Sequence, residues 1–141
     1  IKKRWGGKLI LKGIMDAEDA RLAADSGADA LIVSNHGGRQ LDGAPSSISA
    51  LPGIVEAAGR DIEVWMDGGV RSGQDVLKAR ALGARGTLIG RAFLYGLGAA
   101  GEAGVTRALQ IIHKELDVSM AFCGRTRIDD VGSDILLPGS F

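Results

Sequence analysis

DSGADALIVSN, at Asp25–Asn35, has a close copy later in the chain, ALGARGTLIGR at Ala81–Arg91. Each copy runs from the end of a helical stretch through a Gly-Ala turn into an apolar run and then a polar loop. An apolar run bounded by glycine and polar residues predicts a buried strand. Because strands that alternate with helices are joined by right-handed crossovers, this repeat predicts an α/β fold with a parallel sheet.

Two more apolar runs extend the pattern to four strand–helix units, with strands expected at residues 8–14, 30–34, 62–67 and 86–89. These strands read as apolar on both faces, as in a parallel sheet covered by helices. We expect helices from Asp16, with Asp19 three residues on, to Gly27, from Ser46 to Ala58, from Ser72, with Asp75 three residues on, to Gly83, and from about Val105 to Met120. Pro52 is expected to begin or interrupt the second of these helices.

Composition excludes several classes of protein. The 141 residues carry 17 basic and 17 acidic side chains and a pI near 6.9, which favours neither nucleic acid nor an anionic membrane as a partner. A single cysteine, Cys123, excludes an internal disulfide and fits a reducing, cytoplasmic compartment. No run of eighteen apolar residues predicts a membrane span, and we expect no metal centre.

Polar side chains follow each predicted strand. Lys12 ends the first, Ser34 with His36 and Arg39 follows the second, and the third and fourth lead to further arginines. Because the carboxyl ends of parallel strands meet at one face, these groups predict an active site there. His36 can exchange a proton near neutral pH, and Arg39 can hold a carboxylate through two parallel hydrogen bonds. This pair suits chemistry on the carbon next to a carboxylate.

The loops after the last two strands predict a phosphate site. They contain Asp67, Gly68, Gly69, Val70 and Arg71 in one, and Gly90 and Arg91 in the other. Each combines free backbone N–H groups with an arginine next to a helix start, whose dipole favours an anion. In closed eight-stranded α/β barrels the corresponding loops commonly bind phosphate. A carboxylate such as Asp67 could instead accept a hydrogen bond from a sugar or polyol hydroxyl.

These motifs resemble the FMN-dependent α-hydroxy-acid oxidase and dehydrogenase family, which includes glycolate oxidase, lactate oxidase and mandelate dehydrogenase. The resemblance rests on Leu11–Gly13, Ser34–Asp42, Asp67–Arg71 and Leu88–Arg91. SNHGGRQLD at Ser34–Asp42 is the most specific of these, since glycine–arginine phosphate loops recur in other barrels. The resemblance implies that residues 1–141 form the second half of an FMN-binding (β/α)8 barrel, plus a C-terminal helix, with the N-terminal half outside this chain.

The resemblance also implies residue roles. Lys12 would stabilise the reduced flavin and Ser34 would hydrogen-bond it, while His36 would be the base and Arg39 would bind the substrate carboxylate. The ribityl chain and phosphate would be held by Asp67, Gly68, Gly69, Val70, Arg71, Gly90 and Arg91. The expected partners are a small 2-hydroxy acid, the N-terminal half of the barrel and further copies of the protein in a tetramer.

The sequence leaves several alternatives open. His36 could take a proton from the substrate hydroxyl, with hydride transfer to flavin, or from the α-carbon, giving a carbanion. The resemblance favours L-lactate as the substrate. The electron acceptor could be oxygen, a quinone or a cytochrome. Peripheral attachment to the inner membrane, through a loop outside this chain, also stays open.

Two other functions are compatible with parts of the sequence. A non-catalytic half-barrel could bind a phosphorylated ligand or self-associate, with His36 and Arg39 idle. A purine-nucleotide oxidoreductase barrel would fit the phosphate loops, but it would need a cysteine loop, and Cys123 falls late in the chain and away from any strand end.

Overall fold

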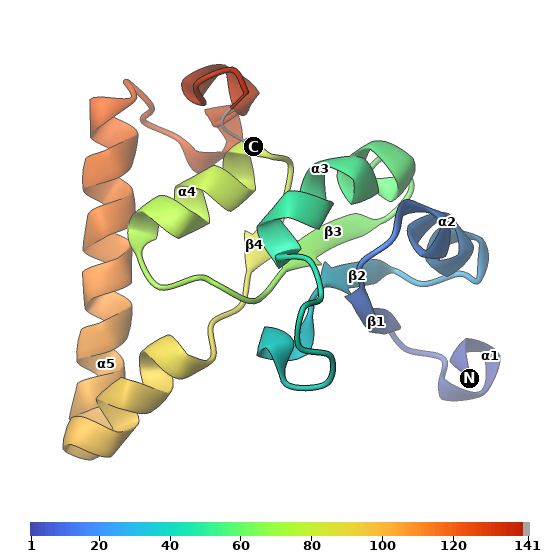
Figure 1. Ribbon diagram of the computed structural model, residues 1–141, viewed down its shortest axis with the longest axis horizontal. Helices are drawn as coiled ribbons and strands as arrows, with labels where there is room; N and C mark the ends of the chain where they lie inside the picture. The colour runs from blue at the N-terminus through green and yellow to red at the C-terminus, as the bar shows by residue number, and fades with distance from the viewer. Residues whose placement is uncertain (140–141) are drawn as a thin grey trace.

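The protein, seen in a computed structural model that describes residues 1–139, is built on one parallel sheet (Figure 1). Its four strands lie in chain order, β1-β2-β3-β4, and every neighbouring pair is parallel. The strands are β1 (Ile10–Ile14), β2 (Ala30–Val33), β3 (Glu63–Met66) and β4 (Gly86–Thr87). The four strand–helix units predicted from the repeat are therefore confirmed, with strand ends displaced by one or two residues.

A helix follows each strand. The α-helices are α1 (Lys2–Trp5), α2 (Ala17–Asp25), α3 (Ser47–Ala58), α4 (Gly73–Ala81) and α5 (Arg91–Phe122). Of these, α2, α3 and α4 cover one face of the sheet, and α5 packs on the outside of α4 (Figure 1). Three short 3₁₀ turns, η1 (His36–Gly38), η2 (Ile128–Asp130) and η3 (Ser133–Ile135), complete the secondary structure. No helix among residues 1–139 is both long and apolar enough to cross a membrane.

The predicted helix starts differ in detail. Ser72 caps α4 as expected, since its hydroxyl accepts from the Asp75 N–H while the Asp75 carboxylate accepts from the Ser72 N–H. At α2 the Asp16 carboxylate accepts from the N–H of Glu18, so Asp19 does not take the reciprocal role. Ser46 caps α3, and that helix runs through Pro52. The expected break at Pro52 is therefore wrong, because the capped first turn precedes the proline.

The last helix is longer than the expected 105–120. It starts at Arg91 and bends where Ala100 and Gly101 leave helical geometry, with a φ of 57° at Gly101. The two arms pack closely, because an ideal Cβ at Gly104 would lie within bonding distance of the Gly96 carbonyl. Glycine at both positions lets the two backbones meet, and the second arm runs back alongside α4 (Figure 1).

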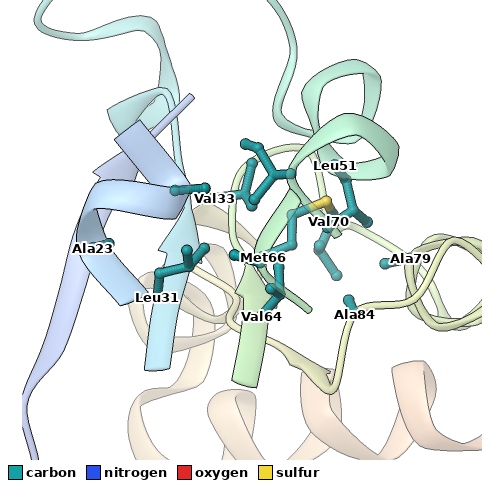
Figure 2. Packing of buried hydrophobic residues seen from close by; sticks show 12 residues of the cluster. Ala23, Leu31, Val33, Leu51, Val64, Met66, Val70, Ala79 and Ala84 are labelled. Atoms are coloured by element: carbon teal, nitrogen blue, oxygen red, sulfur yellow. The ribbon is translucent and has the colours of Figure 1, made fainter. Parts of the chain in front are cut away.

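The core lies between the sheet and α2, α3 and α4 (Figure 2). Alternate residues of the strands point into it, including Leu31, Val33, Val64 and Met66, all of them buried. At about 25 cal/mol per Å² of buried apolar surface, side chains of this size each contribute about 1.5–3 kcal/mol on burial. This layer holds the strands, and therefore the loops at their carboxyl ends, in fixed positions.

No helix among residues 1–139 covers the opposite face of the sheet. Ile10 is 54% exposed and Leu88 is 37% exposed, and Trp65 is only partly buried between them. All four residues of β2 are buried, but β1 and β3 are not buried on both faces as expected. The exposed face is the one that would point into a closed barrel.

The amino-terminal end is fixed by the Asp29 carboxylate. It pairs with the ammonium groups of Lys2 and Lys8, at 2.5 and 3.0 Å, and accepts from the Leu9 N–H. The hydrogen bond from Lys2, followed by those from Leu9 and Lys8, holds the pKa of Asp29 well below its usual range. Lys2 and Lys8 thus take part in an ion-pair network within the chain.

The C-terminal segment packs against α4 and α5. Leu136 joins a small cluster with Leu77, Ala81 and Val131. The chain is therefore packed at least through Leu136, while Leu137 is largely exposed and residues 140–141 lie outside the described part of the chain.

Candidate active site

Three strand ends converge on the ammonium group of Lys12. Its Nζ donates to Ser34 Oγ at 2.8 Å and lies 2.8 Å from Asp67 Oδ2. Lys12 belongs to β1, and the other two residues directly follow β2 and β3, so the strand order alone brings them together. The prediction that polar groups at the carboxyl ends of the strands share one face is confirmed in this arrangement.

The loop after β2 turns immediately to present His36. This residue has a φ of +56°, the one positive value for a non-glycine residue among residues 1–139. Its N–H donates to Ser34 Oγ at 3.2 Å. Gly13 lies against the imidazole, since an ideal Cβ there would be 2.7 Å from His36 Nε2. A side chain at position 13 would push the imidazole away.

A cleft of about 1000 Å³ opens at this end of the sheet. Its lining residues include all the predicted site residues except Ser34, namely Lys12, His36, Arg39, Asp67, Gly68, Gly69, Val70, Arg71, Gly90 and Arg91. Four cationic side chains and one carboxylate therefore share the cleft, which favours an anionic ligand.

Ser34 lies beneath the cleft rather than on its wall. It is fully buried, and its hydroxyl joins the Lys12 ammonium to the His36 N–H. The sequence predicted that Ser34 belongs to the site, but it did not predict the hydrogen bond between Ser34 and Lys12. The contact depends on a side chain from a different strand, which spacing along the chain does not reveal.

The two predicted phosphate loops differ in their backbone donors. At the start of α4, the N–H groups of Arg71 and Ser72 donate to Asp75 Oδ2, each at 3.0 Å, and that of Gly73 donates to Glu115 Oε2 at 2.9 Å. The expectation of free N–H groups at this helix start is therefore wrong. The first turn of α5, which begins after Gly90, has no side-chain cap. An anion would find its open helix start there.

Arg91, which starts α5, reaches towards the loop that carries His36. An ideal Cβ at Gly37 would lie 3.6 Å from an Arg91 guanidinium nitrogen, so this side chain reaches the histidine loop.

One wall of the cleft was not predicted. It comes from α5 and contains Leu94, Tyr95, Ala108, Ile111 and Ile112, while Gln40 adds a polar group beside Arg39. The sequence did not predict a helix before residue 105, because glycine disfavours helix and this stretch has glycines at 96, 98, 101 and 104. Tyr95 lies on this wall, 74% exposed.

These residues fit a flavin mononucleotide. The cleft lies at the upper end of the volume range of about 300–1,000 Å³ found for small-molecule sites. Arg71 and Arg91 can neutralise a phosphate dianion, and Lys12 supplies a cation near the histidine. Gly68 and Gly69 have φ values of 85° and 79°, a conformation that glycine adopts readily and that brings the backbone itself to the cleft.

Comparison with known proteins places the chain in a family. The sequence model described as "FMN-dependent dehydrogenase" matches residues 1–138. An L-lactate dehydrogenase of Caulobacter sp. (strain K31) is 55% identical over 136 residues, covering 96% of this chain and 36% of that protein. A pre-mycofactocin synthase of Mycobacterium tuberculosis (strain ATCC 25618 / H37Rv) is 48% identical over 142 residues, covering 100% of this chain and 36% of that protein.

Solved structures agree with the fold. A mandelate oxidase mutant with a monooxide FMN adduct superposes with a TM-score of 0.83 at 49% identity, over 86% of this chain and 38% of that chain. Mandelate oxidase with benzoyl-formic acid gives the same TM-score and identity, over 86% and 36%. The chain thus spans a little over a third of the length of these relatives. It belongs to the FMN-dependent dehydrogenase family, whose cofactor is FMN, and it forms the C-terminal half of a (β/α)8 barrel.

Proposed function

We propose that this chain supplies the proton-transfer and carboxylate-binding residues of an enzyme that oxidises an L-2-hydroxy acid to the 2-oxo acid with FMN. The observation that carries the proposal is the single cleft that brings His36 and Arg39 together with Lys12, Arg71 and Arg91. A base with a carboxylate clamp at one loop, and arginines with an open helix start at another, suit a carboxylate substrate beside a phosphorylated cofactor.

The chain's own residues perform the polar steps. Arg39 binds the substrate carboxylate and so fixes the orientation of the neighbouring hydroxyl-bearing carbon. His36 accepts a proton from the substrate hydroxyl or from the α-carbon. Lys12 and Arg39 offset the negative charge that develops as this proton leaves. FMN, when bound, accepts the electron pair.

Residues of this chain would contact the flavin ring and the phosphate end of the cofactor. Lys12 would contact the flavin ring, with Ser34 acting on the ring through Lys12, because the Ser34 hydroxyl is enclosed. Gly68, Gly69, Val70 and Arg71, with Gly90 and Arg91, would hold the phosphate, and Asp67 would accept from the polyol chain. The uncapped start of α5 favours the Gly90–Arg91 side for the phosphate.

Closure of the site requires more protein than residues 1–141. We propose that these residues act as a single segment whose exposed sheet face is covered by the N-terminal half of the same barrel. The exposure of Ile10 and Leu88, and the share of the relatives that this chain spans, support that partner. A homo-oligomer in a reducing, cytoplasmic compartment, in keeping with the exposed thiol of Cys123, completes the proposal.

The test is an anaerobic absorbance spectrum of the complete protein loaded with FMN, before and after addition of L-lactate, L-mandelate and glycolate in turn. Bleaching of the flavin by at least one of these acids, and not by propionate, is expected. FMN that binds without bleaching under every acid would support the alternative of a non-catalytic half-barrel, or a reaction closer to that of the pre-mycofactocin synthase relative.

A further inference from the structure

We propose that Asn35 is a positioning residue for the reaction, which sets the placement of His36 and links the histidine loop to the loop after β3. This inference rests on the proposed function, because it assigns Asn35 a role through the base. Asn35 is not among the residues that line the cleft, and its side chain points into the loop.

His36 needs such support because of its backbone. A φ of +56° places its Cβ in the left-handed region, which residues other than glycine avoid. A conformation of this kind persists only where surrounding contacts determine it. Two glycines follow, Gly37 and Gly38, both also at positive φ. The loop therefore has little intrinsic preference for the conformation that presents the imidazole.

The Asn35 carboxamide closes the loop at both ends. Its Oδ1 accepts from the Gly37 N–H at 3.0 Å, and its Nδ2 donates to the Pro45 carbonyl, ten residues along the chain, at 3.2 Å. Its backbone N–H donates to the Oγ of Ser47, a buried residue that starts α3. The His36 turn is thereby fixed to the rigid start of a helix.

The same side chain meets the loop after β3. An ideal Cβ at Gly68 would lie 3.2 Å from Asn35 Oδ1 and 2.9 Å from Ser47 Oγ. The absence of a side chain at position 68 therefore lets this loop, which continues to Arg71, pack directly on Asn35. A change at Asn35 would move His36 relative to the groups proposed to hold the cofactor.

The experiment compares Asn35→Ala and Asn35→Asp with the complete, FMN-loaded wild-type protein by anaerobic stopped-flow flavin reduction. Asn35→Ala removes both carboxamide bonds, and its limiting rate of reduction per bound flavin should fall about 10- to 100-fold, as displacements near 1 Å do. Asn35→Asp keeps the acceptor for the Gly37 N–H and should fall less. Substrate and FMN dissociation constants should change by less than threefold in Asn35→Asp.

Ser46→Ala is the matched control. It weakens the cap of α3 at the far end of the same loop without touching the His36 turn. Its thermal midpoint should fall, while its limiting rate stays near that of wild type. A limiting rate in Asn35→Asp and Asn35→Ala equal to that of Ser46→Ala would overturn the positioning role. A wild-type flavin that no 2-hydroxy acid reduces would overturn the proposed function and the positioning role with it.

Discussion

Arg39 is the residue on which substrate choice depends in the proposed reaction. It is exposed on the cleft beside His36, and a guanidinium can grip a carboxylate through two parallel bonds whereas an ammonium cannot. Arg39→Lys should therefore raise the KM for the 2-hydroxy acid about 10- to 100-fold, the equivalent of one charged hydrogen bond. Steady-state kinetics of the complete protein would measure this, with Arg21→Lys on the exposed side of α2 as control. An unchanged KM would remove Arg39 from carboxylate binding.

Asp29 makes the fold sensitive to acid. Its pKa is lowered in the folded state by Lys2, Leu9 and Lys8, so the carboxylate stabilises the fold above its unfolded pKa of about 3.9. This contribution is lost as the pH falls through the lower pKa of the folded state. Asp29→Asn should thus unfold at lower urea concentration than wild type at pH 7, and the difference should shrink below about pH 4. A difference that stays constant down to pH 2.5 would contradict the assignment.

The sequence predicted which residues belong to the candidate site better than it predicted the contacts between them. Lys12, His36, Arg39 and the arginine loops could be found because each lies in or directly after a recognisable apolar strand. The burial of Ser34 and the approach of Gly13 to the imidazole could not, because both depend on neighbours from a different strand or loop. Asn35 looks like an ordinary loop residue until its bonds to Gly37 and Pro45 are known.

α4 packs closely on α5 at Gly73. An ideal Cβ at Gly73 would overlap the backbone nitrogen of Leu116, and the Gly73 N–H donates to Glu115. Gly73→Ala should therefore force the helices apart and lower the free energy of unfolding by about 1–3 kcal/mol or more. Urea unfolding of the protein would measure the loss.

Gly53 provides the matched control for that substitution. It lies inside α3 with no atom within 4 Å of an ideal Cβ. Gly53→Ala should be neutral or stabilising by up to about 1 kcal/mol, since alanine favours helix. Equal losses in the two variants would contradict the close packing of α4 on α5.

Element boundaries followed the sequence where a local signal marks them. The Ser72–Asp75 capping box starts α4 as predicted, because it depends only on residues three apart. The start of α5 at Arg91 was missed, because its glycines disfavour helix and the packing of Gly96 against Gly104 cannot be read from the sequence. Pro52 was misjudged for a similar reason, since burial of Leu51 and Ile54 holds α3 together around it.

The whole sheet has two edges, β1 and β4, that pair on one side only. In a closed barrel both edges would gain a neighbour, and the face that carries Ile10 and Trp65 would be covered. Backbone N–H groups of β1 that do not donate to β2 should therefore exchange with deuterium quickly in residues 1–141 alone and slowly in the complete protein. Mass spectrometry after pulse labelling would show this. Equal protection in both would mean that something other than the N-terminal half covers the edge.

The architecture as a whole was predictable because it repeats. Asp25–Asn35 and Ala81–Arg91 present the same turn, strand and loop twice, and the sheet places them as the second and fourth units. The sequence of the strands did not predict that one face of the sheet is uncovered, since Ile10, Trp65 and Leu88 are as apolar as core residues. Their exposure reflects the lack of a covering layer among residues 1–139 rather than any polar pattern.

The most direct test of the central claim is the rate of anaerobic flavin reduction by L-lactate in the complete protein and in His36→Gln. Glutamine fills similar space but cannot accept the proton, so FMN should stay bound while the rate falls by about 10²–10⁴-fold. This result would identify His36 as the base of a flavin-dependent 2-hydroxy-acid oxidation. A His36→Gln variant that reduces its flavin within a few fold of wild type would contradict that mechanism.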